Sequence, residues 1–272
     1  DQPLPSVLGW GLGLGALAPG LMAGTIRKNV MQMAKMFITG STAEEAFGTL
    51  EKLRKNRLAF TVDILGEAAV SESEAEMYAK KYMDLIEKLA ELSKKWPEDE
   101  LIDRDHQGAI SKVNVSVKVS SLYSQFDPIS PINSINAVKE RLRPIFRKAR
   151  ELGVFLNLDM ESYYHKDLTI ALFKSLMDEE EFKNHNNVGM VIQAYLKDSE
   201  ADLRGMIEWA KKRSGRITIR LVKGAYWDYE TILAKQRDWP IPVFTDKKAT
   251  DANFEKLSLI MLENDAVLKS AF

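Results

Sequence analysis

The chain has 272 residues, of which 45% are hydrophobic and 28% are charged, and its formal net charge at pH 7 is −1. This length suits one large or two small globular domains, and the near-zero net charge gives no sign of a nucleic-acid partner. Because the sequence contains no cysteine, it excludes a disulfide framework, a thiolate metal site and a catalytic thiol.

The chain begins with an uncharged stretch, residues 3–25, whose length raises the question of a membrane or targeting role. Its glycines and prolines instead favour a packed lead-in to a helix, and a signal peptide would need a basic start where this chain has Asp1. Two helices are expected next, over Gly24–Phe37 and Thr42–Arg54. We therefore expect residues 1–57 to form an N-terminal helical lead-in.

The rest of the chain alternates between two patterns. Runs rich in β-branched and aromatic residues predict five strands and the start of a sixth: Phe60–Leu65, Val113–Val119, Val154–Met160, Val188–Tyr195, Ile217–Val222 and a run from Ala266. Segments with helical periodicity lie between them: Ser71–Lys95, Ala137–Leu152, Glu200–Arg213 and Thr250–Glu263. Ser71 and Glu74 have the spacing of a capping box, and the charged run Asp178–Glu181 predicts a solvated helix end.

Strands that alternate with helices indicate a parallel α/β fold. A doubly wound sheet would usually carry a glycine-rich phosphate loop after its first strand, and Gly66–Ala69 lacks that pattern. Polar residues instead gather at strand ends, which favours a (β/α)8 TIM-like barrel. Since the predicted strands are too few to close a barrel, we expect residues 58–272 to hold its first five to six β/α units, with the C-terminal part absent from the chain.

Three charged residues lie at the ends of the second and third predicted strands or just after them. Lys118 interrupts an apolar strand, so it either faces a polar cavity or reaches water along its stem at a strand edge. Asp159 and Glu161 are two residues apart and share one face of an extended chain. They are interpreted either as carboxylates that pair with Lys118 or orient a substrate amine, or as part of a structural ion pair.

The segment RLVKGAYW, Arg220–Trp227, is the strongest functional signal from the residues themselves. Arg220 and Lys223 place two cations at one strand end, where they suit a phosphate or an electron-rich ring. Gly224 allows close backbone approach, and Tyr226 and Trp227 offer flat surfaces for stacking. A loop with a core tryptophan is the alternative.

Two further observations complete the pattern. Gln193 ends the fourth predicted strand, where its amide could meet the edge of a polar heterocycle. His106, His165 and His185 lack metal-ligand spacing, so we interpret them as surface residues and expect no metal site.

Five blocks in order, FTVDILGEA, VNVSVKVSSL, LNLDMES, GMVIQAYL and RLVKGAYWDYE, resemble the proline dehydrogenase family over about Phe37 to Phe272. FITGSTAEEAF and PVFTDKKATDANF are most similar to the proline dehydrogenase domain of bacterial bifunctional proline utilization A. The resemblance implies a distorted barrel that holds FAD and oxidises L-proline to Δ1-pyrroline-5-carboxylate. Hydride would pass to flavin N5 and electrons to a quinone, as the first step of proline catabolism.

The resemblance also assigns roles. Lys118 matches a lysine that binds the proline carboxylate, and Arg220 matches an arginine that bonds the flavin near N5. Asp159, Tyr226, Asp63 and Glu67 match positions in the substrate pocket, and Asp159 and Tyr226 join Lys118 and Arg220 as the expected catalytic set. The expected cofactor contacts are Gln193, Lys223, Gly224, Ala225 and Trp227 at the flavin and Thr245, Lys247 and Thr250 around the adenosine and pyrophosphate.

The resemblance places the protein in the cytoplasm and leaves open peripheral association with the inner membrane and a homo-oligomer. The family's last elements carry a Thr-His pair for the cofactor and an Arg-Arg pair for proline, and this sequence ends before them. We therefore expect the segment alone to bind FAD and turn over proline poorly. A Schiff-base lyase using Lys118 or Lys223 is one alternative. A non-catalytic fragment, with Gly24–Arg54 as a docking surface, is the other.

Overall fold

The structure is a computed structural model and describes residues 23–30, 33, 38–66 and 68–272. Contacts divide the chain into two compact units, Asp1–Lys52 and Leu53–Phe272. No helix within the described ranges is long and apolar enough to span a membrane.

The predicted N-terminal helices are described only in part. Residues 23–30 and 33 are helical, whereas most of the uncharged stretch 3–25 and the remainder of the expected first helix lie outside the described residues. The second expected helix is α3 (Ala43–Lys55). The domain boundary after residue 57 stays a prediction.

The Leu53–Phe272 unit is built on a parallel six-stranded sheet with the order β1-β4-β5-β6-β7-β8. Its strands are β1 (Val62–Asp63), β4 (Asn114–Val117), β5 (Phe155–Leu158), β6 (Val188–Gln193), β7 (Ile217–Val222) and β8 (Leu268–Ala271). All neighbouring pairs are parallel. In the part of the chain described here, β1 and β8 are the two edges, so the α/β fold is an open, incomplete (β/α)8-type barrel, as predicted.

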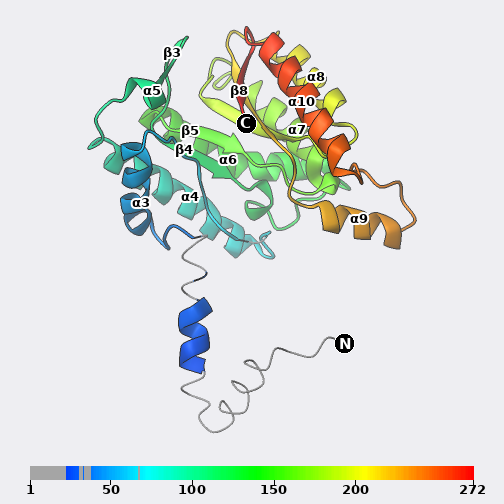
Figure 1. Cartoon of the computed structure of the whole chain (residues 1–272), viewed down its shortest axis with the longest axis horizontal. Helices are drawn as coiled ribbons and strands as arrows, with labels where there is room; N and C mark the ends of the chain where they lie inside the picture. The colour runs from blue at the N-terminus through cyan, green and yellow to red at the C-terminus, as the bar shows by residue number, and fades with distance from the viewer. Residues whose placement is uncertain (1–22, 31–32, 34–37, 67) are drawn as a thin grey trace. The chain divides into compact units, whose positions relative to one another are not determined.

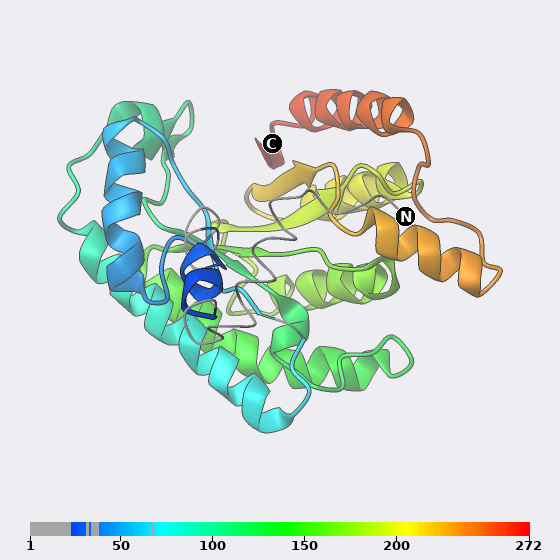
Figure 2. The ribbon, with the colours of Figure 1, turned by 60° about the horizontal axis from the view of Figure 1, so that its bottom comes forward.

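Helices connect these strands and cover the sheet. They are α4 (Glu72–Ser93), α5 (Glu100–Asp103), α6 (Pro131–Leu152), α7 (Tyr163–Met177), α8 (Ser199–Ala210), α9 (Trp227–Gln236) and α10 (Lys247–Glu263), with a short 3₁₀ helix, η1 (Val119–Ser121). Helix α6 packs against α4 and α7, and α10 packs on β7 and β8 (Figure 1). In Figure 2, α4 and α6 lie in the lower part of the picture and α10 lies at its top, near the two ends of the strand order.

Local chemistry explains where the helices begin and end. The Ser71 hydroxyl accepts from Glu74 N at 3.3 Å, which caps α4 as the sequence predicts, while the Glu74 carboxylate returns to Val70 N at 3.0 Å. Helix α6 begins at Pro131, six residues before the expected Ala137, because a proline suits the first helical turn. It ends at Gly153, whose φ of 67° is the left-handed cap conformation.

Several elements were not predicted. Helices α7 and α9 were missed, and so was the antiparallel hairpin of β2 (Arg104–Asp105) and β3 (Gly108–Ala109). The first strand is also shorter than expected, because β1 pairs with β4 through only two residues at the edge of the sheet.

Side chains alternate between the two faces of the sheet. Val115, Val117, Leu156 and Leu158 are fully buried on one face and form part of the core. The opposite face of β4 and β5 carries polar residues instead, and it is this face that leads to the site described below.

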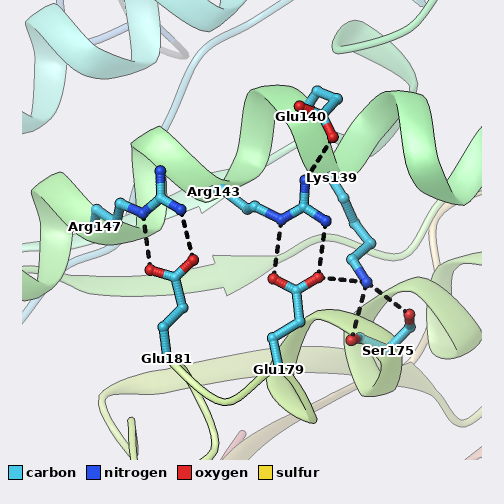
Figure 3. A network of polar contacts seen from close by, with 7 residues as sticks. All are labelled: Lys139, Glu140, Arg143, Arg147, Ser175, Glu179 and Glu181. Atoms are coloured by element: carbon cyan, nitrogen blue, oxygen red, sulfur yellow. Dashed lines mark hydrogen bonds and ion pairs between the residues drawn. The ribbon is translucent and has the colours of Figure 1, made fainter.

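Helix α6 also carries an ion-pair network with the segment after α7, drawn in Figure 3. Arg143 bonds both carboxylate oxygens of Glu179, at 2.9 and 3.0 Å, and Lys139 reaches the same carboxylate at 2.5 Å. Arg147 bonds both oxygens of Glu181, at 2.8 and 2.6 Å. The run Asp178–Glu181 is therefore not simply a solvated helix end, because these carboxylates connect α7 to α6.

Candidate active site

A cavity of about 450 Å³ lies at the carboxyl ends of strands β1, β4, β5, β6 and β7. Parallel α/β folds place their ligand sites at this end of the strands. The predicted site residues that line it are Asp63, Lys118, Asp159, Gln193, Arg220, Lys223, Gly224, Ala225 and Tyr226. Glu161 lines it as well. The structure thus brings together residues from five strand ends that are far apart in the sequence.

Asp159 and Arg220 form the charged centre of this cavity. A guanidinium nitrogen of Arg220 bonds Asp159 Oδ1, and the Ser116 hydroxyl donates to the same oxygen at 2.6 Å. Burial raises the pKa of the Asp159 carboxyl above its usual range, although Ser116 and Arg220 act in the opposite direction. The site therefore keeps a desolvated carboxylate beside a cation, which is common where chemistry takes place.

Lys118 does not form the carboxylate pair that was one of the alternatives for Asp159, because Asp159 binds Arg220 instead. The Lys118 ammonium donates to the carbonyl of Gly66 at 3.0 Å, and its backbone N–H donates to the hydroxyl of Tyr82 at 3.0 Å. Burial raises the pKa of Tyr82 to about 12, so this hydroxyl stays neutral and holds the Lys118 backbone. The Lys118 side chain lines the cavity as a cation.

Glu161 does not pair with Lys118 either. Its carboxylate accepts from the backbone N–H of Ser120 at 3.0 Å and from the Ser120 hydroxyl at 2.5 Å. Glu161 is only 9% exposed, so these bonds compensate much of the cost of its burial. It serves to join the ends of β4 and β5.

Lys223 connects the cavity to the start of helix α10. Its ammonium binds one oxygen of Asp251 and Lys247 binds the other, both at 2.5 Å. Thr250 is buried in the same turn, whereas Thr245 and Lys247 are exposed. These residues lie together at a helix N-terminus, where backbone N–H groups favour anions, but Thr245, Lys247 and Thr250 do not line the cavity.

Gly224 has a φ of 130°, a conformation that other residues rarely adopt. A Cβ atom there would lie 2.4 Å from the ring of Tyr195, so the close approach itself requires glycine. Trp227 follows as the first residue of α9, 42% exposed, with its indole N–H bonded to the carbonyl of Phe244 at 2.9 Å. It is therefore not a core tryptophan, and it lies outside the cavity lining.

Two buried polar atoms of the cavity have no partner among the described residues: Gln193 Oε1 and Arg220 Nε. Gln193 is 2% exposed, and its amide nitrogen reaches Met160 O only at 3.5 Å. Buried polar atoms are usually hydrogen-bonded. An unpartnered acceptor and donor beside one cavity fit a ligand with a polar edge.

Three residues were missed by sequence reasoning, one that lines the cavity and two that support its lining from beneath. Tyr82 was placed only on the apolar face of a helix, and neither Ser116 nor Asn157 was singled out. The available signal was alternation: Ser116 and Asn157 are polar at positions that share a face with Lys118 and Asp159. Glu67, expected in the pocket, lies outside the described residues.

No cluster of metal-ligating side chains occurs in the described part of the chain. The expectation that all three histidines lie at the surface is wrong. His106 is exposed, but His185 is 9% exposed and its Nε2 atom is buried. Burial lowers the pKa of His185 to about 4, so its imidazole is neutral at pH 7, as a buried structural residue would be.

Fold and cavity together define a barrel-type α/β protein with a candidate small-molecule site at its strand ends. The family described as "Proline dehydrogenase" matches residues 46–272. This match covers most of the chain, so the chain belongs to the proline dehydrogenase family.

Individual relatives agree with this assignment. Proline dehydrogenase 1 of Bacillus subtilis (strain 168) is 30% identical over 229 residues, which are 84% of this chain and 61% of that protein. Bifunctional protein PutA of Klebsiella aerogenes is 29% identical over 223 residues, which are 82% of this chain and 16% of that protein. The chain thus spans only part of the length of the relatives it matches.

A solved structure is similar over most of the chain. It is the crystal structure of proline utilization A (PutA) from Bdellovibrio bacteriovorus inactivated by N-propargylglycine, with a TM-score of 0.91 and 55% sequence identity. The match covers 93% of this chain and 26% of that one.

Proposed function

We propose that the protein to which this chain contributes is an FAD-dependent dehydrogenase that oxidises L-proline to Δ1-pyrroline-5-carboxylate. One observation carries the proposal: in a chain of the proline dehydrogenase family, Lys118, Asp159 and Arg220 line one cavity at the strand ends. When bound, FAD supplies the two-electron oxidation, and a quinone takes up the electrons. The nitrogen of proline loses a proton as its C5 hydrogen leaves as hydride.

The unpartnered Gln193 Oε1 and Arg220 Nε atoms support a flavin as the ligand, because the polar edge of its ring carries both donors and acceptors. Arg220 would lie near N5 and steady the negative charge that develops there. Lys223, Gly224, Ala225 and Trp227 would contact the same ring. Gly224 allows this approach, since it has no side chain.

The adenosine and pyrophosphate would lie along Thr245, Lys247 and Thr250. The support is their position at the first turn of α10, where backbone N–H groups and two lysines favour a phosphate. Lys223 and Lys247 both bind Asp251, so an arriving pyrophosphate would compete with that carboxylate for the two cations.

The proline side of the site would consist of Lys118, Asp63, Asp159 and Tyr226. Lys118 would bind the substrate carboxylate with the charge-assisted hydrogen bond that an ammonium provides. This contact would fix the ring so that C5 faces the oxidant. Asp159 would hold Arg220 in place through the ion pair already described.

We place this activity in the cytoplasm, with peripheral association to the inner membrane where the quinone lies, and with a homo-oligomer left open. The lyase alternative gains no support from the contacts. Lys118 binds a backbone carbonyl and Lys223 binds Asp251, and neither arrangement presents a free amine to a carbonyl substrate.

The test uses the complete protein that carries this chain. Purified protein should be yellow, and anaerobic L-proline should bleach the flavin absorbance while D-proline does not. Colourless protein that borohydride links covalently to a carbonyl substrate would support the lyase and overturn the proposal.

A further inference from the structure

A buried polar layer lies directly beneath the cavity. Ser116 on β4 and Asn157 on β5 are register partners, and each is only 1% exposed. Barrels of this type usually fill such inward positions with branched apolar residues. A buried hydroxyl and amide cost free energy unless hydrogen bonds compensate for their burial.

Several contacts of Ser116 and Asn157 converge on one atom, Oδ1 of Asp159. The Ser116 hydroxyl donates to it at 2.6 Å, and Asn157 Nδ2 lies 3.4 Å from it. Asn157 Nδ2 also donates to the Ser116 hydroxyl oxygen at 3.1 Å, and Arg220 reaches that hydroxyl at 3.4 Å. The hydroxyl oxygen accepts from Asn157 and Arg220, so its own hydrogen is directed to Asp159. Asn157 Nδ2 also donates to the carbonyl of Leu158 at 3.3 Å, and Asn157 Oδ1 has no partner among the described residues.

This arrangement determines the orientation of the Asp159 carboxylate. Its Oδ1 atom also receives the guanidinium of Arg220, so the oxygen that faces Arg220 is the one that Ser116 holds from below. Without the hydroxyl, the carboxylate could rotate about its last bond, and Arg220 would lose the partner that fixes its end.

The charge of Asp159 depends on the same contacts. The groups that face it are Arg220 from β7, Asp63 from β1 and Tyr82 from α4, with Lys118 lining the same cavity. Burial and Asp63 raise the pKa of Asp159, whereas Ser116 and Arg220 lower it. Loss of the Ser116 hydroxyl therefore favours the protonated carboxyl.

We propose that Ser116 and Asn157 are positioning residues, which hold the Asp159 carboxylate in the orientation that keeps Arg220 directed at the cavity. The effects on turnover that we expect from this role rest on the proposed function. The role itself does not require Ser116 or Asn157 to touch either substrate or cofactor.

The experiment is a double-mutant cycle in the complete protein with Ser116→Ala, Asp159→Asn and the double variant. Ser116→Ala should lower kcat/KM for L-proline about tenfold, the size expected for one hydrogen bond to a charged group. The fall should lie mainly in kcat, and the acid limb of the pH profile should move to higher pH. In the Asp159→Asn background the same substitution should have little further effect.

Ser134→Ala is the matched control. Ser134, in the first turn of α6, is also a fully buried serine, but its hydroxyl donates to the carbonyl of Asp127, which precedes the helix. This control should leave kcat/KM and the pH profile unchanged. Ser116→Thr, which retains the hydroxyl, should recover most of the activity lost in Ser116→Ala.

Equal losses from Ser116→Ala in the wild-type and Asp159→Asn backgrounds, or an unmoved pH profile, would overturn the proposal. Failure of the proposed function is a separate result, because the unaltered protein would then not oxidise proline. In that case the unfolding transitions of the same four proteins measure the coupling between Ser116 and Asp159 without turnover, and additive effects there would equally exclude a positioning role.

Discussion

Two regions of the Leu53–Phe272 unit gather charged side chains, and they differ in how those charges are satisfied. In the network on α6, Arg143 and Arg147 each bond both oxygens of one glutamate. Bonds from Arg143 lower the pKa of Glu179, and bonds from Arg147 lower that of Glu181. In the cavity, by contrast, burial raises the pKa of Asp159.

The difference separates charges that stabilise the fold from charges that our proposal assigns to the active site. The carboxylates of Glu179 and Glu181, in the segment after α7, are held in their charged form and stabilise the fold modestly. The cavity instead leaves Arg220 Nε and Gln193 Oε1 without partners among the described residues. Buried polar atoms without partners lower the stability of the folded protein, and such destabilisation is expected where a ligand binds.

The largest expected effect comes from Arg220→Met in the complete protein. Loss of the guanidinium removes the donor proposed near flavin N5, so the rate of flavin reduction by proline should fall about a hundredfold or more. Stopped-flow absorbance measures it. Arg147→Met, which breaks a surface pair of the α6 network, should leave that rate unchanged. Comparable losses of rate in both variants would contradict the proposed difference between the cavity and the α6 network.

Lys118→Ala should have a smaller and different effect. It removes the proposed partner of the substrate carboxylate, so KM for L-proline should rise about tenfold or more while kcat falls less. Steady-state kinetics provide the measurement. Lys183→Ala is the control, because Lys183 is an exposed lysine that pairs with Glu180. An unchanged KM in Lys118→Ala would show that Lys118 does not bind the substrate carboxylate.

Glu179→Gln should act on stability alone. It breaks the contacts of Glu179 with Lys139 and Arg143, and unfolding should become easier by about 1 kcal/mol after allowance for solvent screening. Because the pKa of Glu179 is lowered in the folded state, its contribution is present above the unfolded value and is lost as pH falls through the folded value. Denaturant titrations at pH 7 and at acid pH should therefore differ less for the variant than for the parent.

His185→Phe should give the smallest effect at pH 7 and refines the comparison, because the buried Nε2 atom of His185 has no partner among the described residues but lies outside the cavity. Its folded pKa of about 4 is below the unfolded value, so the unfolded chain binds the proton first and stability is lost as pH falls from about 6.5. The parent should lose about 2 kcal/mol more than the variant between pH 7 and pH 5. Equal acid sensitivity, measured by thermal unfolding, would contradict this.

The elements with strong local patterns were predictable. Strand β7 has the expected bounds, Ile217–Val222, because it is apolar and lies inside the sheet. Helices α7 and α9 were missed since polar and aromatic residues interrupt their apolar periodicity. The start of α6 was placed too late because Pro131 was not recognised as a first-turn residue.

The candidate site divides in the same way. That Lys118, Asp159, Gln193 and Arg220 would meet at one end of the sheet followed from their places after parallel strands. Which of these side chains bond to one another could not be predicted, because a parallel sheet brings together residues that are far apart in the sequence. Asp159 and Arg220 are 61 residues apart, and nothing local distinguishes that pair from one between Asp159 and Lys118.

The sequence by itself determined the α/β alternation, the polar strand ends and the resemblance to the proline dehydrogenase family, because each of these is written in local periodicity or contiguous motifs. Only the tertiary structure decided that Ser116 and Asn157 donate hydrogen bonds to Asp159, that Lys118 donates to the carbonyl of Gly66, and that His185 is buried. Hydrogen bonds and desolvation depend on the distances between segments that are far apart in the chain, and the order of residues along the sequence does not specify those distances.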